Sequence, residues 1–448
     1  MSLAKKIAEV ALETFDSLPQ KCKPRTLANG QKEWTPMSAV VLSRPIPPFS
    51  SSTDIELKIV SLATGTKSLP VSALPKCNGL ILHDCHAEIL AFRGLNCWLL
   101  CEIENMLQNN TDSSPWLQLD HASHKSSAAL PPCSIRPGVE IHLFSTEAPC
   151  GDASMELLMA SSQAAGADTS PWELPASQST ADQTSDRVAL PHGRGYFSNL
   201  GALRRKPARA DAEISMSKSC TDKIMLKQFT SLVQFPVNLF LKLTREGFLK
   251  DVIVYENQYN ESDYKRAFAA GGRLGLLVPS DVSDLEEGPI FFNVHRLPAD
   301  FRRFEFEKQR TSSVRNKVTN ISAVWLGTDS LRGGQEHIEA LVNGVRQGFK
   351  QFDRRIGKAS ALCRYNLLRR AIGIGRMLQD RGFPPPLPLV AALPLYSELK
   401  MGSRSGELSS RKDKVLSQLG GWPEIALKDD FEIADILSGR QQQSTHSR

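Results

Sequence analysis

The sequence predicts an α/β fold in which a mixed sheet is flanked by helices. Apolar or alternating segments typical of strands occur at residues 37–43, 55–62 and 140–145. Between them, residues 89–107 repeat their apolar side chains about every 3.6 positions, which is typical of a buried helix. Strands that alternate with helices along a chain favour the α/β class.

The two ends of the chain fit the same scheme. Residues 3–18 place apolar side chains on one helical face and charges on the other, so we expect a helix packed on the core rather than a signal peptide. Later strands are expected at 249–255, 290–294 and 321–326. Because no break in composition divides residues 1–448, we expect one domain.

Two segments, 108–137 and 161–187, are expected to be mobile surface insertions; the second is rich in Ser, Ala, Gln and Thr. No apolar run approaches the roughly eighteen residues of a membrane span. The nine cysteines are an odd number without secretory context, which indicates a reducing compartment rather than a disulfide framework. We therefore expect a cytoplasmic or nuclear protein.

Positive charge is concentrated in two segments. The formal net charge is +6, yet residues 192–227 hold eight Lys and Arg against three acids, and residues 346–376 hold nine against one. The remainder of the chain is therefore acidic overall. Positive charge focused in this way indicates a polyanionic partner.

The most informative motif is His86-Ala87-Glu88, at the start of the expected long helix. At a helix N-terminus the two polar side chains can point into one cavity, the imidazole toward a metal and the carboxylate toward the water that the metal holds. Taken alone, the motif also fits a capping histidine with a first-turn glutamate that the helix dipole favours.

Two cysteines supply the context for that motif. Cys150 follows a predicted strand and begins a second helical pattern, and Cys220 directly precedes a third. Zinc nucleobase deaminases combine H-x-E with P-C-x-x-C, in which one His and two Cys hold the metal. Here Ala153 stands at the position of the second cysteine and cannot ligate, so Cys220 is the candidate third ligand.

The order His-Ala-Glu, Pro-Cys-Gly-Asp and then a delayed cysteine resembles the catalytic domain of the ADAR-type RNA adenosine deaminases. Residues 63–67 (ATGTK), 359–364 (ASALCR) and 419–422 (LGGW) stand in family order, so the resemblance runs from about Trp34 to the C-terminal region. It implies a cytidine-deaminase-like α/β core, enlarged by a C-terminal helical and strand region around a basic internal pocket. It also implies zinc held by His86, Cys150 and Cys220, with Glu88 as the proton shuttle.

Members of this family that edit long duplexes usually carry double-stranded-RNA-binding modules, for which the chain ahead of Trp34 has no room. The sequence is therefore similar to the tRNA-specific branch. That resemblance implies hydrolytic deamination of adenosine to inosine in tRNA, immediately 3′ of the anticodon of alanine tRNA. We expect a monomer that binds tRNA and neither DNA nor a membrane.

Two alternatives stay open at this stage. A deaminase of other structured RNA, or of cytidine or free nucleosides, would use the same zinc chemistry, although compact enzymes of that kind need neither this length nor these basic segments. A non-catalytic RNA-binding subunit would keep zinc only for structure. Glu88 argues against that second alternative, because a structural zinc site has no use for the acid.

The first basic segment lies in a loop interrupted by glycine and proline just before Cys220. Cations in such a loop are expected to face RNA phosphates, and the candidates are Arg194, Arg204, Arg205 and Lys206. On local evidence, the loop at residues 64–67 fits ribose recognition and an ordinary turn equally well. The family resemblance, however, places Thr66 against a ribose 2′-hydroxyl.

In the second basic segment, arginines alternate with large apolar residues over 362–372. They either lie exposed across the surface or surround an internal anion, because a buried guanidinium is costly unless it is paired. The resemblance favours the anion, since ADAR-type domains enclose inositol hexakisphosphate. Its implied ligands are Arg93, Ser217, Lys223, Arg364, Tyr396, Lys400, Lys412, Trp422, Glu424 and Asp430.

The sequence departs from the family at this pocket. Phe92, Leu226 and Ile425 stand where the duplex-editing relatives have basic residues, and Lys227 is expected to replace one of the lost cations. Asp84, with Lys223, matches a hydrogen-bonded relay between the polyphosphate and the metal site.

Overall fold

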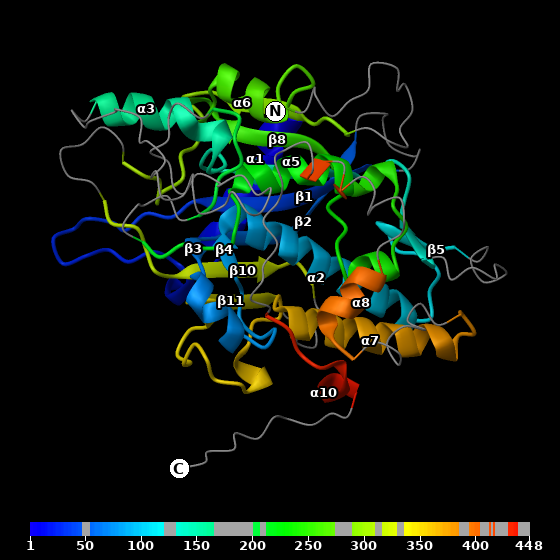
Figure 1. Cartoon of the computed structure of the whole chain (residues 1–448). Helices are drawn as coiled ribbons and strands as arrows, with labels where there is room; N and C mark the ends of the chain where they lie inside the picture. Colours follow the sequence, from blue (N-terminus) through cyan, green and yellow to red (C-terminus); the bar gives the residue numbers. More distant parts are fainter. Residues whose placement is uncertain are drawn as a thin grey trace, which may run out of the picture.

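Figure 1 shows a computed structural model of the chain. The structure describes residues 1–46, 54–120, 131–164, 200–206, 212–273, 289–309, 316–328, 336–384, 394–403, 412–413, 415–416 and 429–437.

The described residues form a central sheet of eight strands in the order β12-β11-β10-β2-β1-β7-β8-β9. Strands from β12 to β7 pair antiparallel, whereas β7, β8 and β9 run parallel. Their bounds are β1 Met37–Pro45, β2 Ile55–Thr64, β7 Glu140–Ser145, β8 Leu249–Tyr255, β9 Asn293–Leu297, β10 Ser322–Leu326, β11 His337–Val342 and β12 Val345–Arg346. The predicted mixed α/β class is confirmed, although the strand expected at 290–294 lies a few residues later and the β11-β12 hairpin was not anticipated.

Helices cover both faces of this sheet (Figure 1). Successive residues of β1 alternate between the two cores: Ala39 and Val41 join the core under α1 (Leu3–Asp16), and Val40 and Leu42 join the core under α2 (Ala87–Gln108). On α1 the apolar face meets two aromatic rings from a distant segment, with Phe15 lying 4.8 Å from Phe304 between ring centroids. The N-terminal segment is thus a helix packed on the core, as predicted.

The α2 helix is buried along nearly its whole length, because it lies between the sheet and α7 (Arg364–Asp380). Trp98, 1% exposed, donates from its indole nitrogen to the Gly327 carbonyl at 3.1 Å. A helix with so little free surface is a rigid support for the residues at its N-terminus.

Smaller elements surround the N-terminus of α2. They are β3 Thr66–Ser68, β4 Asp84–His86, β5 Leu117–Leu119, β6 Cys133–Ile135, α3 Met155–Ala164, α5 Cys220–Thr230, α6 Glu261–Phe268, α8 Tyr396–Gly402 and α10 Ile433–Leu437. Among the described helices, none combines the length and apolar character that a membrane-spanning helix requires.

The segment expected as a mobile insertion at 108–137 is partly built into the core. Its described parts pair β5 with β6, and Trp116 and Leu117 are buried in the cluster that contains α2. The expectation of a free surface loop is therefore wrong for these parts, because their apolar residues supply a two-stranded cover for the end of α2. Of the second expected insertion, residues 165–187 lie outside the described residues.

The packing of α2 on β2 predicts an unusual response to a glycine substitution. A Cβ at Gly94 would lie 2.6 Å from the Ser61 Cβ. Helix propensity alone favours alanine over glycine by about 1 kcal/mol, but overpacking typically costs about 1–3 kcal/mol. We expect Gly94→Ala to lower the melting temperature. Gly373→Ala on α7 is the matched control, because nothing lies within 4 Å of its Cβ position; equal effects at the two sites would contradict the prediction.

Candidate active site

Three side chains from distant parts of the sequence meet at the start of α2. His86 ends β4, Cys150 precedes a short 3-10 helix at Asp152–Ser154, and Cys220 is the first residue of α5. The His86 Nδ1 atom lies 3.6 Å from the Cys150 Sγ and 3.5 Å from the Cys220 Sγ. These ligand atoms all lie within 4.8 Å of one another, and an imidazole with two thiols is a donor set that suits zinc.

Glu88 lies beside this group rather than in it. Its side chain is 4% exposed, and its Oε2 accepts a hydrogen bond from the Cys220 thiol at 3.3 Å. His86 is the N-cap residue of α2, but its side chain makes no capping hydrogen bond, so the capping alternative does not explain the motif. The arrangement leaves the imidazole directed at the two sulfurs, with a carboxylate next to them.

The pKa values of the three acidic side chains in this site are shifted in different directions. The hydrogen bond from Cys220 and the charge of Lys206 lower the pKa of Cys150 well below its ordinary value. Burial raises the pKa of Cys220. Burial and the charge of Cys150 also raise the pKa of Glu88. A carboxyl group with a raised pKa, next to a possible metal centre, is suited to accept and return a proton.

Asp84 connects the metal group to a set of buried cations. Its carboxylate accepts from Lys206 Nζ at 2.8 Å, from Lys223 Nζ at 2.5 Å and from Ser217 Oγ at 2.6 Å. Burial alone would raise the pKa of Asp84, but the charges of Lys206 and Lys223 outweigh it and hold that pKa well below its usual range. The structure therefore brings Asp84 and Lys223 together as the expected relay requires.

The position of Lys206 differs from the sequence-based expectation. Its side chain is 3% exposed, and its Nζ contacts the Cys220 Sγ at 3.4 Å as well as Asp84. A buried ammonium needs a carboxylate partner, and Asp84 provides one. Lys206 thus extends the relay to a metal ligand, and the expectation that it faces RNA phosphates from a free loop is wrong.

The rest of the first basic segment is also more ordered than expected. Residues 204–206 pair with residues 217–219, through the Lys206 amide to the Ser217 carbonyl at 2.8 Å and the Ser219 amide to the Arg204 carbonyl at 2.8 Å. Arg204 is 2% exposed, so its expected exposure is wrong as well, whereas Arg205 is half-buried. Arg194 lies outside the described residues.

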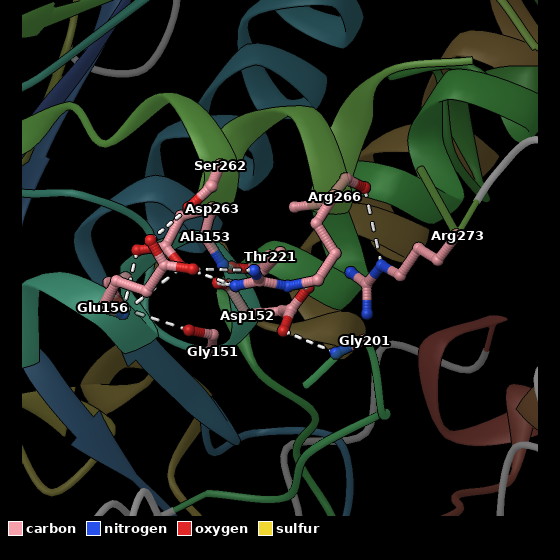
Figure 2. A network of polar contacts seen from close by, with 12 residues as sticks. Gly151, Asp152, Ala153, Glu156, Gly201, Thr221, Ser262, Asp263, Arg266 and Arg273 are labelled. Carbon is pink, nitrogen blue, oxygen red and sulfur yellow. Dashed lines mark hydrogen bonds and ion pairs between the residues drawn. The ribbon is translucent and has the colours of Figure 1, made fainter. Parts of the chain in front are cut away.

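A network of polar contacts holds the Cys150 turn against α5 (Figure 2). Arg266 on α6 binds the Asp152 Oδ2 at 3.0 Å and the Glu156 Oε1 at 3.1 Å, and the Asp152 Oδ1 accepts from the Gly201 amide at 2.8 Å. The Thr221 hydroxyl donates to the Cys150 carbonyl at 3.0 Å. Neither Arg266 nor α6 was anticipated from the sequence; the aspartate that follows Pro-Cys-Gly was the available signal.

Gly151 makes the close approach of these segments possible. Its φ is +110°, and a Cβ there would lie 2.3 Å from the Ser219 Oγ. Ser219 in turn caps α5, because its hydroxyl accepts the Asp222 amide at 3.1 Å. The two cysteine-bearing segments therefore meet at a residue without a side chain, which lets both sulfurs lie on the same side.

Two other sets of polar side chains lie near the site or resemble a catalytic group. Thr66 pairs with His86 in the β3-β4 ladder and is half-buried, so it lies near the metal group. Ser43, His142 and Asp251 form a hydrogen-bonded chain with two 2.8 Å contacts, but Ser43 is 3% exposed, too buried to meet a substrate. This chain links β1, β7 and β8 inside the sheet.

A second group of possible metal ligands among the described residues contains Cys77, His83 and Asp429. Asp429 already accepts from the Gly79 amide at 2.6 Å and contacts the His83 Nε2 at 2.7 Å. The Arg364 guanidinium lies 3.5 Å from the same carboxylate, and its positive charge disfavours a metal cation. We interpret this group as the link that holds residue 429 against Arg364 and the segment that precedes His86.

Behind Asp84, further cations lie within electrostatic range of one another. Burial and the charges of Lys223, Arg93 and Lys400 lower the pKa of Lys227 to about 7. The Lys227 ammonium is buried and has no hydrogen-bond partner among the described residues, and it lies 5.4 Å from the centre of the Phe92 ring. The same cause, burial followed by neighbouring positive charge, lowers the pKa of Lys218 to about 7.

The remaining residues expected around an anion lie in the same region where they are described. The Arg364 guanidinium lies over the Tyr396 ring, 5.8 Å from its centre. The positive charge of Lys412 contributes to lowering the pKa of Lys218. Asp430 instead accepts the Ser397 amide at 3.0 Å. Trp422 and Glu424 lie outside the described residues.

Comparisons with known proteins identify the family of the chain. The adenosine-deaminase (editase) domain family matches residues 61–424. The tRNA-specific adenosine deaminase 1 of Schizosaccharomyces pombe is 31% identical over 81% of this chain and 83% of its own length, and that of Saccharomyces cerevisiae is 34% identical over 56% and 58%. The double-stranded RNA-specific editase B2 of Mus musculus is 24% identical over 38% of this chain and 21% of its own length. The chain therefore belongs to the adenosine-deaminase (editase) domain family and is a deaminase.

Proposed function

We propose that the chain hydrolyses adenosine to inosine in tRNA, at the adenosine immediately 3′ of the anticodon of alanine tRNA. The observation that carries the reaction type is the buried Glu88 carboxylate, 3.3 Å from the sulfur of Cys220, beside His86 and Cys150. The substrate class rests on the relatives, because the tRNA-specific adenosine deaminases 1 of Schizosaccharomyces pombe and Saccharomyces cerevisiae match 81% and 56% of the chain, against 38% for the double-stranded RNA-specific editase B2 of Mus musculus.

The donor set fits zinc better than a hard cation, since two sulfurs and an imidazole nitrogen are soft or borderline ligands. His86, Cys150 and Cys220 would hold the ion. When bound, zinc supplies Lewis acidity, which makes water a nucleophile near neutral pH.

The residues of the chain supply proton transfer and positioning. Glu88 takes the proton of the attacking water as the C6–O bond forms, and returns it to the amino group as the C6–N bond breaks and ammonia leaves. Its raised pKa suits both directions, because the group can hold a proton between the two steps. Lys206 holds the Cys220 sulfur from the other side, and Asp84 fixes Lys206. Thr66 pairs with His86 in the neighbouring strand, and in this proposal its hydroxyl contacts the ribose 2′-hydroxyl.

A tRNA anticodon loop suits this site for a further reason. Its bases are already unpaired, so little energy is needed to bring the target adenine into a pocket. Arg205 and Arg194 are the candidates from the first basic segment for contacts with phosphates, since Arg204 and Lys206 are occupied inside the protein. A cytidine deaminase remains the alternative, and a comparison of tRNA with free cytidine and free adenosine as substrates separates the two.

The basic pocket supports a second component of the proposal, an enclosed inositol hexakisphosphate. Its fit is tested by Lys227, whose buried ammonium has no hydrogen-bond partner among the described residues, and by the shared positive field of Arg93, Lys223 and Lys400. A polyphosphate would neutralise charges that otherwise repel one another in a poorly solvated interior.

The role of Glu88 predicts the behaviour of its amide variant. Glu88→Gln keeps the size and packing of the side chain but cannot accept the proton, so inosine formation should fall by about 10²–10⁴-fold. Melting temperature and zinc content should match those of the wild type. Turnover within a few-fold of the wild type would contradict the proposed mechanism.

The delayed ligand predicts a difference between two buried cysteines. Cys220→Ala should lower bound zinc well below one ion per chain, because it removes one of three donors. Cys85→Ala is the control: Cys85 is also buried, and burial raises its pKa to about 12, but it is not among the metal group. Metal analysis of the two purified variants decides the point, and equal zinc content would remove Cys220 from the site.

The anion predicts the sign of a stability change at Lys227. If a polyphosphate is bound, Lys227→Met breaks a buried charge pair and should destabilise the protein by about 3–5 kcal/mol. In an empty pocket the same change would remove an unpaired buried charge and raise stability. Lys250→Met, at an exposed pair with Glu140, is the control. Acid denaturation of the wild type should release about one inositol hexakisphosphate per chain; stable, active protein that releases none would refute the proposal.

A further inference from the structure

A second cationic surface lies outside the site. It is the segment 346–358, which follows β12 and is called here the 346–358 loop. Two of its aromatic rings are unusually accessible, with Phe349 39% and Phe352 41% exposed. Around them stand five cations and one acid, giving a net charge of +4; they are Arg346, Lys350, Arg354, Arg355, Lys358 and Asp353.

The acid of the loop does not neutralise this charge, although three of the five cations make contacts within the loop: Arg346 donates to the Gly357 carbonyl at 3.1 Å. Asp353 pairs with Arg355 at 2.6 Å and with Lys358 at 2.7 Å, which accounts for the acid. For Lys350 and Arg354, both exposed, the described part of the chain provides no carboxylate within ion-pair distance. In this respect the loop differs from Lys206 and Arg204, which are buried.

The rings and the cations are interleaved. The Lys358 ammonium lies 4.9 Å from the centre of the Phe349 ring, and the ammonium of Lys76, on the neighbouring 3-10 helix at Val71–Lys76, lies 5.5 Å from that of Phe352. Accessible aromatic faces set among uncompensated cations are the pattern by which proteins hold unpaired bases and their phosphates. Exposed phenylalanines alone would fit an apolar partner, but this charge density favours a polyanion.

The loop is fixed relative to the site. Val345, directly before it, packs in a small core with Ile81 and Met216, from the segments that precede His86 and Cys220. The Leu82 amide donates to the Gly344 carbonyl at 3.0 Å. In Figure 1 the loop, in yellow, follows β11 on the side of the molecule where β3 and β4 lie. The 346–358 loop is therefore held in a fixed position relative to the segment that carries His86 and the segment that carries Cys220.

We propose that the 346–358 loop, with Lys76, is a docking surface for the tRNA substrate outside the target nucleotide: Lys76, Lys350 and Arg354 bind phosphates, and Phe349 and Phe352 stack on unpaired bases. This inference rests on the proposed function and deepens it. Because such contacts are made equally in the bound and reacting states, the surface lowers KM and leaves kcat unchanged.

The experiment measures binding and editing of total tRNA from yeast that lacks its own tRNA-specific adenosine deaminase. One variant combines Phe349→Ala with Phe352→Ala, and another combines Lys76→Ala, Lys350→Ala and Arg354→Ala. The controls are Phe291→Ala, 42% exposed beside β9 at the opposite edge of the sheet, and a triple alanine variant of the exposed Lys6, Lys21 and Lys317.

For the aromatic variant we expect Kd and KM to rise at least about 5-fold. The kcat should stay within about 2-fold of the wild-type value. For the triple cation variant, the slope of log Kd against log salt should fall by about 2, and more than in its control. The inference would be overturned if Kd and the salt slope were unchanged in both variants, which is the result expected of a surface for a protein partner. Equal losses of affinity in the control variants would also overturn it. Wild-type protein that forms no inosine in tRNA but loses tRNA affinity in the variants would overturn the proposed function and support the surface.

Discussion

The arrangement of the site depends on one buried carboxylate. Asp84 receives two ammonium groups and a hydroxyl, and its Oδ1 also accepts the backbone amide of His86 at 3.1 Å. Burying these charges separately would be costly, so each is stable only with the others in place. Because Lys206 reaches from Asp84 to the sulfur of Cys220, the cluster fixes the strand that carries the histidine against the helix that carries the second cysteine.

This cluster also explains why the metal group and the basic pocket belong together. Its positive charges exceed its single carboxylate, and Lys227 and Arg93 lie close enough to add to the excess. On one side the sulfurs of Cys150 and Cys220, with Glu88, can supply negative charge. On the other side the described residues offer Asp429, which His83 and Arg364 already share. An enclosed polyphosphate would balance that side, which in our proposal makes anion binding a condition for a well-formed metal site.

Much of the fold and the centre of the site could be predicted from the sequence, because local patterns carry that information. Period-two and period-3.6 segments predicted β1, β2, β7, β8 and β10 and the helices α1, α2, α3 and α5. The structure brings together His86, Cys150 and Cys220, which the sequence singled out because each stands near the start of a helical pattern and because their order resembles that of a known family. The β11-β12 hairpin was missed, although Asn343-Gly344 between its two strands is a typical hairpin turn and was the available signal.

The errors concern partners that are remote in sequence. Lys206 and Arg204 were expected to be free because few acids stand near them in the chain. However, Asp84 lies 122 residues from Lys206, and Asp152, the first of the acids whose charge acts on the Arg204 guanidinium, precedes Arg204 by 52 residues. Arg266 was missed for the same reason, because the acids that it joins, Asp152 and Glu156, precede it by more than a hundred residues. A cation count along the sequence therefore identifies how much positive charge must be neutralised, but only the fold decides where.

That distinction separates the two halves of the second basic segment. In α7, Arg364 lies beside Tyr396 and Asp429 inside the pocket, and helical periodicity turns its neighbours Leu367, Leu368 and Ala371 into the core. In the 346–358 loop there is no such periodicity, and the cations stand on the surface with their aromatic neighbours. In our proposals the run of net charge +8 therefore divides between two tasks, with the partly buried Arg364 beside the enclosed anion and the exposed cations of the loop on the RNA. Buried cations require an anion that stays with the protein, whereas exposed ones can release counterions each time a nucleic acid binds and leaves.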